Sequence, residues 1–403
     1  MKKFTKLSLV AAVAVAGLTS ANAKPLEEAI KDVDVSGTVT YRYDNFGDDN
    51  GTGEKTNANK YKINFNLSSK VNDYVKFNTR LNVVDGGAND FVGLDKAKGN
   101  SDTQANVGLA HAYFGISVIP NTTVNVGKQG LATPWTVATD NDGGEQTGTG
   151  IFSVTAVDKF VLGLAYFNQT NIDTAKTDAM TLPLSGSEDI YAATLQANYG
   201  IVNAEAWYLN AVDQFDTYTL AVHGKAELAE NANIGYELRY VSLKFDDKFT
   251  TKHGLTEDKN SLLRAAVNGK VGIVNARVAY SVTDDKGGIT ALDTDAQNAS
   301  LGWRLNTLGK ADAKFLQTTV GADILDNLNL SLNYNKLEYD VAKSALGKDT
   351  LTTKTTGTAK QDEYFAQLTY KMSKNLDGYI RYGKQDFDGA EQNSGRLQVN
   401  YKF

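Results

Sequence analysis

Residues Arg396-Leu397-Gln398-Val399-Asn400-Tyr401-Lys402-Phe403 alternate strictly between polar and apolar side chains. Successive side chains of a β-strand point to opposite faces of the sheet. The stretch therefore predicts a strand with one face of Leu, Val, Tyr and Phe and one face of Arg, Gln, Asn and Lys. Such a strand suits a sheet that meets water on one side and an apolar medium on the other.

The same alternation recurs along the chain in segments of about ten residues, the length expected for tilted strands that cross a membrane. Clear examples are residues 61–67, 75–81, 234–240 and 274–280. Tyr and Phe lie towards the ends of the apolar faces, as in the aromatic girdles of membrane barrels. A helical period is not sustained. The pattern predicts an all-β fold, a transmembrane antiparallel β-barrel.

The connections between these segments alternate between short and long. Short ones lie at 72–73, 118–121, 156–159, 199–200, 228–231, 269–272, 326–327 and 373–375, and long ones at 44–59, 85–105, 130–149, 169–187, 245–259, 284–314, 339–360 and 387–393. This predicts short periplasmic turns and long extracellular loops. One connection on the long side, 213–216, is itself short. Residues 297–303 could form one more strand, but bacterial barrels have even strand numbers. We therefore expect 18 strands, with 16 as the alternative because residues 106–117 and 150–155 alternate poorly.

Residues 1–23 have the features of a secretory signal peptide. Lys2, Lys3 and Lys6 precede an apolar run of about a dozen residues, too short for a membrane helix of about 20, and Ala21-Asn22-Ala23 resembles a cleavage site. The last strand, with its final aromatic residue, resembles the recognition signal of bacterial outer-membrane proteins. We expect residues 24–403 to form one barrel embedded in outer-membrane lipid.

The composition excludes several functions. The chain has no cysteine and only three histidines, and it contains neither a Gly-x-Ser-x-Gly element nor a paired-histidine metal motif, so no enzyme activity is expected. Without the lysines of residues 1–23, 38 basic residues face 47 acidic ones, a net charge of about −9 that argues against nucleic acid. Eighteen strands enclose an aqueous lumen, which predicts a channel for small hydrophilic solutes and ions.

The loop near 130–149 is a candidate constriction because it carries Trp135 and the carboxylates Asp140, Asp142 and Glu145. Folded into the lumen, these carboxylates would attract cations; an ordinary solvated surface loop is the alternative. If the apolar strand faces point outward, the basic residues that point into the lumen are Arg42, Lys62, Arg80, Arg239, Arg264, Arg277 and Arg396. An arginine wall opposite an acidic loop predicts a transverse field across the constriction.

Several stretches are similar to the campylobacterial major outer membrane porins, among them Lys24 to Gly37, Tyr41 to Asp44, Gly127 to Gln129 and the final Tyr401 to Phe403. The resemblance implies an 18-stranded homotrimeric barrel for general diffusion, with passive and moderately cation-selective passage of small hydrophilic solutes. It also implies a calcium ion at the constriction loop, with Asp142 at the position of the family's aspartate and Asp140 as the nearby candidate ligand. A substrate-specific channel and a surface adhesin or antigen are the alternatives.

Overall fold

The computed structural model of the chain describes residues 33–48, 55–84, 91–94, 105–140, 144–172, 184–255, 257–344 and 352–403. The predicted signal peptide, the start of the mature chain and Asp142 lie outside these residues. The strands and the helix are β1 (Val33–Asp48), β2 (Lys55–Lys70), β3 (Val75–Val84), β4 (Val92–Gly93), β5 (Asn106–Ile116), β6 (Thr122–Gly130), β7 (Thr147–Val157), β8 (Phe160–Thr170), β9 (Ile190–Asn198), β10 (Asn203–Ala211), β11 (Phe215–Ala229), β12 (Ala232–Phe245), α2 (Asp247–His253), β13 (Lys259–Val271), β14 (Val274–Thr283), β15 (Ala311–Leu325), β16 (Leu328–Asp340), β17 (Thr358–Lys371), β18 (Leu376–Asp386) and β19 (Glu391–Lys402).

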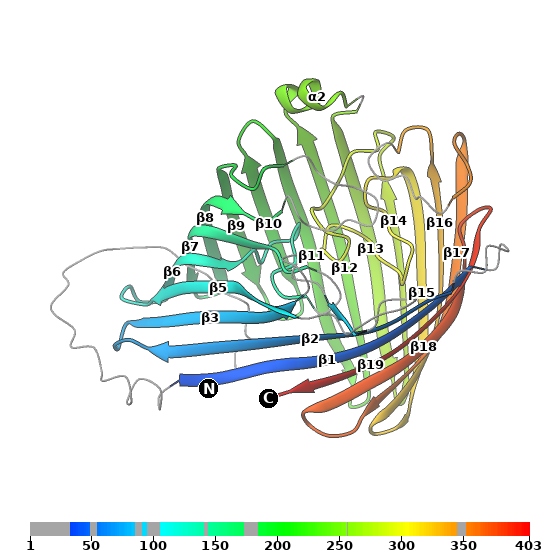
Figure 1. Cartoon of the computed structure of the whole chain (residues 1–403), viewed down its shortest axis with the longest axis horizontal. Coiled ribbons are helices and arrows are strands. Elements are labelled where there is room, and N and C mark those ends of the chain that lie inside the picture. Colours follow the sequence, from blue (N-terminus) through cyan, green and yellow to red (C-terminus); the bar gives the residue numbers. More distant parts are fainter. Residues whose placement is uncertain are drawn as a thin grey trace.

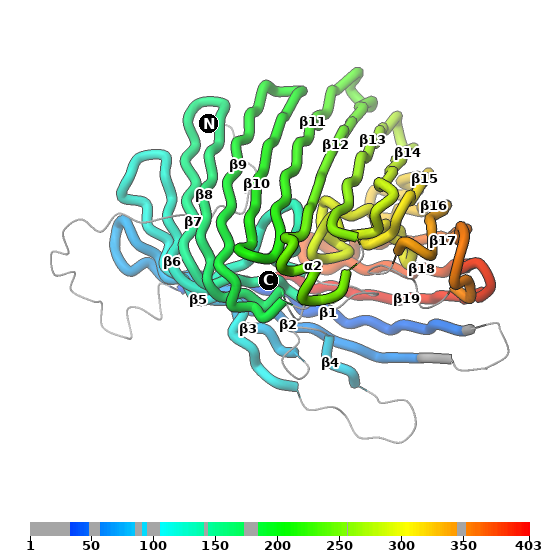
Figure 2. Tube along the Cα trace, turned by 90° about the horizontal axis from the view of Figure 1, so that it is seen from above, coloured from blue at the N-terminus to red at the C-terminus, as the bar shows by residue number. Residues whose placement is uncertain are grey.

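The sheet is a closed antiparallel barrel, in which each long strand pairs with its neighbours in the chain. The last strand, β19, pairs with β1 from Thr38–Lys402 to Asp48–Gln392, and the two lie side by side in Figures 1 and 2. Closure is required because hydrocarbon offers no partner to an open backbone edge. The two-residue strand β4 pairs only with β2 at Lys60–Gly93 and Tyr61–Val92, so the barrel itself has 18 strands.

The strand number and the alternation of connections are confirmed, with one correction. Residues 297–303 belong to a loop, as predicted, and β5 and β7 form despite their poor alternation, so the alternative of 16 strands is wrong. The connection near 387–393 is not long, because β18 ends at Asp386 and β19 begins at Glu391. Asp388 and Gly389 both have positive φ angles, and Phe387 N donates to Ala390 O at 2.8 Å, which makes a tight hairpin turn.

The two faces of the barrel wall differ as the alternation predicts. On β11, Tyr218, Leu220 and Val222 are exposed on the outside, while Thr217 and Thr219 are buried on the inside. Most other strands also expose large aliphatic or aromatic residues at alternate positions. This apolar outer surface is suited to lipid. In the part of the chain that the structure describes, no helix is long and apolar enough to cross a bilayer.

Two connections pack against the inner wall. One is loop 131–146 between β6 and β7, of which the structure describes residues 131–140 and 144–146, and the other is loop 284–310 between β14 and β15. Leu131 and Trp135 of the first and Leu292 of the second join one buried apolar cluster with inner-wall residues such as Leu209 and Val241. Figure 1 shows the second loop in yellow beside the inner faces of β11–β14. Apolar burial therefore holds both loops inside the barrel.

Gly37 allows the seam of the barrel to close around Phe403. The backbone N–H of Gly37 donates to Phe403 O at 2.9 Å, and Phe403 N donates back at 3.1 Å. A Cβ at Gly37 would clash with the carbonyl oxygen of Asn64 and lie 2.6 Å from the Phe403 ring. The seam as it stands therefore leaves no room for a side chain at residue 37.

We expect Gly37→Ala to lower the unfolding temperature of the barrel, because overpacking a close contact costs about 1–3 kcal/mol. The measurement is the temperature at which the folded band disappears in a heat-modifiability gel. Gly395→Ala is the matched control on β19, since the atoms nearest to its added Cβ lie at 3.6 Å or more. Equal unfolding temperatures for the two variants would contradict this role of Gly37.

Candidate functional site

Loop 131–146 is fastened to the barrel wall by Glu145, whose side chain is fully buried. Arg80 of β3 binds it with two nitrogen atoms, Nε to Oε2 at 2.8 Å and Nη2 to Oε1 at 2.5 Å. Asn82 Nδ2 donates to Oε2 at 3.0 Å, and Lys62 Nζ lies 3.8 Å from Oε1. A bidentate guanidinium–carboxylate pair is strong and directional, so Glu145 holds the end of the loop at β2 and β3.

Burial would raise the pKa of the Glu145 carboxyl, but its surroundings more than offset this. The hydrogen bonds and charge of Arg80, with the charge of Lys62 and the amide of Asn82, bring the pKa below its ordinary value of 4.5. The ionised form is thus favoured in the folded protein. The contribution of this anchor to stability is present above the ordinary pKa and is lost as the pH falls through the lowered pKa.

Asp140 lies on the same loop and is also buried. Its backbone carbonyl accepts a hydrogen bond from Lys62 Nζ at 2.6 Å. Calcium prefers several carboxylate and carbonyl oxygens without a competing cation, but Lys62 occupies the Asp140 carbonyl and Arg80 occupies Glu145. Within the described ranges, no three Asp, Glu or His residues form a metal-binding group. These residues alone therefore do not fit calcium, and Asp142 lies outside them.

The second inner loop, residues 284–310, is hydrogen-bonded to the first. The backbone N–H of Leu292 donates to Trp135 O at 2.8 Å, and Asn298 N donates to Pro134 O at 2.9 Å. Gln146 Nε2 completes the contact by donating to Leu292 O at 2.9 Å. The sequence interpretation treated residues 284–314 only as an extracellular loop, so this half of the inner structure was missed.

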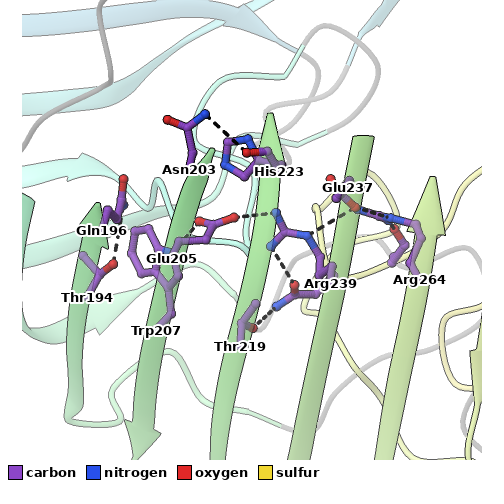
Figure 3. Close-up of polar contacts among 12 residues, drawn as sticks. Thr194, Gln196, Asn203, Glu205, Trp207, Thr219, His223, Glu237, Arg239 and Arg264 are labelled. Atoms are coloured by element: carbon purple, nitrogen blue, oxygen red, sulfur yellow. Dashed lines mark hydrogen bonds and ion pairs between the residues drawn. The ribbon is translucent and has the colours of Figure 1, made fainter. Parts of the chain in front are cut away.

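The second loop also contacts a row of charged side chains on β10, β12 and β13 (Figure 3). Arg239 Nη2 binds Glu205 at 2.6 Å, and Arg264 Nε binds Glu237 at 2.7 Å. Arg264 Nη1 also donates to the backbone carbonyl of Ala299 in the loop at 2.8 Å. Each guanidinium therefore has a carboxylate partner on the wall, and Arg264 supports the loop as well.

Asn298 adds a side-chain contact between the second loop and the same wall. Its Nδ2 donates to Thr219 Oγ1 at 2.7 Å, and its Oδ1 lies 3.5 Å from Arg239 Nη1. The side chain is fully buried. A buried amide with partners on both sides specifies one position of the loop.

The tip of the second loop is fastened to β17 by Glu363, which is fully buried. Its two carboxylate oxygens accept the backbone N–H groups of Trp303 at 2.7 Å and Arg304 at 2.8 Å. Asn335 Nδ2 donates to Oε1 at 2.6 Å. Gly302 has no room for a side chain, because an added Cβ would clash with this carboxylate. The tip is thus held at its backbone.

Aromatic rings and guanidinium groups surround this tip. The Trp303 ring packs at 5.4 Å from Phe365 and 6.4 Å from Phe46. Arg381 lies 5.1 Å from both the Trp303 and Phe365 rings, a cation–π distance. The second loop therefore reaches from β11–β13 across to β17, β18 and β1.

The predicted lumen residues fall into separate groups. Arg80 and Lys62 meet Glu145, whereas Arg396 binds Asp44 at 2.6 Å. Arg42 donates to Gln398 at 2.6 and 2.8 Å and stacks on Phe91 at 4.2 Å. Arg277 on β14 is half-buried and makes no hydrogen bond or ion pair with the other residues that the structure places.

The predicted transverse field assumes that Glu145 faces the arginine wall across an opening. The structure does not place it there. Glu145 contacts that wall directly, because a buried carboxylate needs a cation or several donors within hydrogen-bond distance. The interpretation also missed Glu205 and Glu363. Both occupy the polar side of an alternating strand, and that position is the sequence signal by which such inner-wall carboxylates can be found.

A family model described as "Campylobacter major outer membrane protein" matches residues 1–403. The fold is similar to solved outer-membrane proteins: Pseudomonas aeruginosa OpdL (TM-score 0.71, 15% identity, 93% of this chain and 99% of that chain) and Acinetobacter baumannii OccAB4 (TM-score 0.70, 14%, 92% and 98%). P. aeruginosa OpdK, solved with vanillate, has a TM-score of 0.68 at 13% identity, over 92% of this chain and 98% of that chain. The comparison with curated proteins gave no match. The chain belongs to the Campylobacter major outer membrane protein family and is an integral outer-membrane channel protein, not an enzyme.

Proposed function

We propose that the barrel is a general diffusion porin, through which small hydrophilic solutes and ions pass passively with a moderate preference for cations. The observation that carries this proposal is the pair of inner loops, both held by buried charged contacts at Glu145 and Glu363. Loops fastened in this way would narrow the lumen of a wide barrel. The wall beside them is polar, which suits hydrated solutes.

Two charge observations support the preference for cations. The predicted mature chain has a net charge of about −9, and negative surfaces concentrate cations near a pore mouth. Several wall cations, Arg80, Arg239, Arg264 and Arg396, are neutralised by direct carboxylate partners. Their repulsion of a passing cation is therefore reduced, and Asp140 and Asp142 of the constriction loop would supply the excess negative charge.

We expect the double variant Asp140→Asn, Asp142→Asn to lower the cation preference, because it removes two negative charges from the constriction. The measurement is the reversal potential in a planar bilayer under a salt gradient. Asp213→Asn is the control, since Asp213 is an exposed acid on the short connection between β10 and β11. A reversal potential equal to that of the parent channel would contradict a constriction lined by these two carboxylates.

Calcium at this loop stays a prediction and depends on Asp142. If calcium binds there, it should raise the unfolding temperature of the parent barrel and should not raise that of the Asp142→Asn variant, because a ligand stabilises the state that binds it. Thermal unfolding with calcium and with a chelator measures this. The same curve under both conditions would argue against a calcium site.

A substrate-specific channel is the second candidate, favoured by the aromatic and guanidinium groups at Trp303, Phe365 and Arg381. Liposome swelling with solutes of graded size separates the two functions. A rate that follows size alone supports a general porin, whereas one chemical class that passes faster than its size predicts supports a specific channel.

A further inference from the structure

A polar pocket lies at the end of the barrel that carries the short connection 71–74. It has a volume of about 300 Å³, at the lower end of the range for small-molecule sites. The strands β3, β5 and β6, which lie next to one another in Figure 1, provide much of its lining. We call it the turn pocket and define it by Lys76 and Asn78 of β3, Tyr113 and Gly115 of β5, and Thr123 and Asn125 of β6.

The alternation of β3 places the turn pocket inside the barrel. Arg80 points inward, because it binds a carboxylate of loop 131–146. Side chains two residues apart on a strand share a face, so Asn78 and Lys76 point inward as well. Phe77 lies between them and packs on the outer face against a ring of β5 at 5.2 Å. A solute in the lumen therefore reaches the turn pocket beside the contact that holds the constriction loop.

The turn pocket has an excess of positive charge. Lys70 of β2 also lines it and is the direct cross-strand partner of Lys76. Like charges directly opposite each other on one face of a sheet are destabilising. Asp73 binds Lys70 Nζ at 2.7 Å, whereas the side chain of Lys76 has no ion pair or hydrogen bond with the part of the chain that the structure describes. Two ammonium groups thus share one carboxylate, and a second carboxylate would relieve their repulsion.

Neutral hydrogen-bonding groups surround these charges. Tyr113 and Thr123 provide hydroxyls, and Asn78 and Asn125 provide amides. The two amides converge above Gly115, since an added Cβ there would lie 3.0 Å from Asn125 Oδ1 and 3.5 Å from Asn78 Nδ2. The missing side chain leaves both amides accessible from the pocket. Amides and hydroxyls both donate and accept hydrogen bonds, which suits the hydroxyl groups of a ligand.

We propose that the turn pocket binds a small polyhydroxylated monocarboxylate, the chemistry of a sugar acid. Its carboxylate binds Lys76, and its hydroxyls bond to Asn78, Asn125 and Thr123. The excess of one positive charge matches a monoanion, and the lysine pair repels cations. The inference rests on the proposed porin function, because the ligand reaches the pocket through the lumen. Binding there offsets the repulsion that a negatively charged channel exerts on an anion.

Binding of gluconate to the refolded chain 24–403 tests this proposal. Gluconate has both the carboxylate and the hydroxyls, sorbitol has the hydroxyls without the carboxylate, and hexanoate has the carboxylate without the hydroxyls. Saturation-transfer NMR in detergent micelles measures the half-saturating concentration of each probe, and heat modifiability checks that the barrel is folded. We expect saturable binding of gluconate, with sorbitol and hexanoate each weaker by about tenfold, the loss expected when one charged partner or a set of neutral hydrogen bonds is missing.

Two variants place the binding in the turn pocket. Lys76→Met removes the ammonium group, and Gly115→Ala puts a methyl group between the two amides. Each should weaken gluconate binding by about tenfold, as expected for the loss of one charge-assisted hydrogen bond or of access to the amides. Lys371→Met is the matched control, because Lys371 is an exposed lysine at the corresponding end of β17, outside the pocket. It should bind gluconate as the parent does.

Gluconate that binds no more tightly than sorbitol, or that binds Lys76→Met as tightly as the parent, would overturn the proposal. Bilayer conductance of the same samples distinguishes the site from the porin function. A conducting channel without gluconate binding removes the site and leaves the porin function standing. Saturable gluconate binding to a folded barrel that does not conduct removes the porin function and leaves the site standing.

Discussion

Glu145→Ala is expected to raise the single-channel conductance, to admit larger solutes than the parent channel and to weaken the cation preference. The change leaves Arg80 and Lys62 as buried cations without their carboxylate. Removing one partner of a buried ion pair costs about 3–5 kcal/mol, and about 3 kcal/mol shifts an equilibrium roughly 150-fold. The loop should therefore leave the wall much more often, and the two uncompensated positive charges should repel cations.

The pH dependence of this anchor has a defined sign. Because the pKa of Glu145 lies below its ordinary value of 4.5, the parent channel should keep its conductance from neutral to mildly acidic pH. The conductance should rise only when the pH falls through the lowered pKa and the carboxyl gains a proton. Glu145→Ala should already conduct at the higher level at pH 7.

Two further variants show whether the ion pair between Arg80 and Glu145 itself holds loop 131–146 at the wall. The double variant Arg80→Ala, Glu145→Ala has no buried guanidinium without a carboxylate partner. Part of the stability that the single variant Glu145→Ala loses should therefore return. Glu391→Ala removes the carboxylate of an ion pair with Lys384 at the β18–β19 turn, and it should leave the conductance unchanged. If Glu145→Ala matches the parent in conductance, solute limit and reversal potential, then Glu145 does not hold the constriction.

Glu363→Ala is expected to release the tip of the second loop. The backbone N–H groups of Trp303 and Arg304 and the amide of Asn335 would lose their acceptor, and each buried donor without a partner costs about 1–3 kcal/mol. The loop spans several strands, so its release should raise the conductance and the open-channel noise.

Trypsin gives an independent readout, because Arg304 lies on the released tip. We expect rapid cleavage after Arg304 in the folded Glu363→Ala barrel and slow cleavage in the parent. Glu363→Gln should fall between them, since its amide oxygen still accepts one N–H while its NH₂ group faces the other. Glu338→Ala, at the outer end of β16 near Lys336 and Lys360, is the control. Cleavage and noise at the parent level in Glu363→Ala would exclude this role of Glu363.

Strand number and strand faces could be predicted because they depend on local alternation. The period of two at Arg396–Phe403 and in similar segments identifies which side chains meet lipid, and the membrane enforces that pattern on nearly every strand. The connection at 387–390 is shorter than the predicted 387–393. The sequence does not show this, because Asp388-Gly389 stands among other polar residues. A turn of this kind depends on the two positive φ angles rather than on apolar periodicity.

The inner loops could be predicted only in part, because their positions depend on contacts between distant residues. Trp303 meets an acceptor 60 residues further along the chain, and Gln146 meets Leu292 at a separation of 146 residues. Loop segments have no periodicity that indicates which wall they approach. The acidic residues of loop 131–146 were recognisable, but their sequence does not show that Glu145 binds Arg80 directly.

Planar-bilayer conductance of the refolded chain 24–403, recorded under a salt gradient, tests the central claim most directly. The account predicts stepwise, long-lived openings, with a reversal potential of the sign that favours cations and larger steps for Glu145→Ala. Folding is checked in the same sample by heat modifiability. A folded barrel that shows no conductance, or one whose reversal potential favours anions, would contradict a cation-preferring diffusion porin.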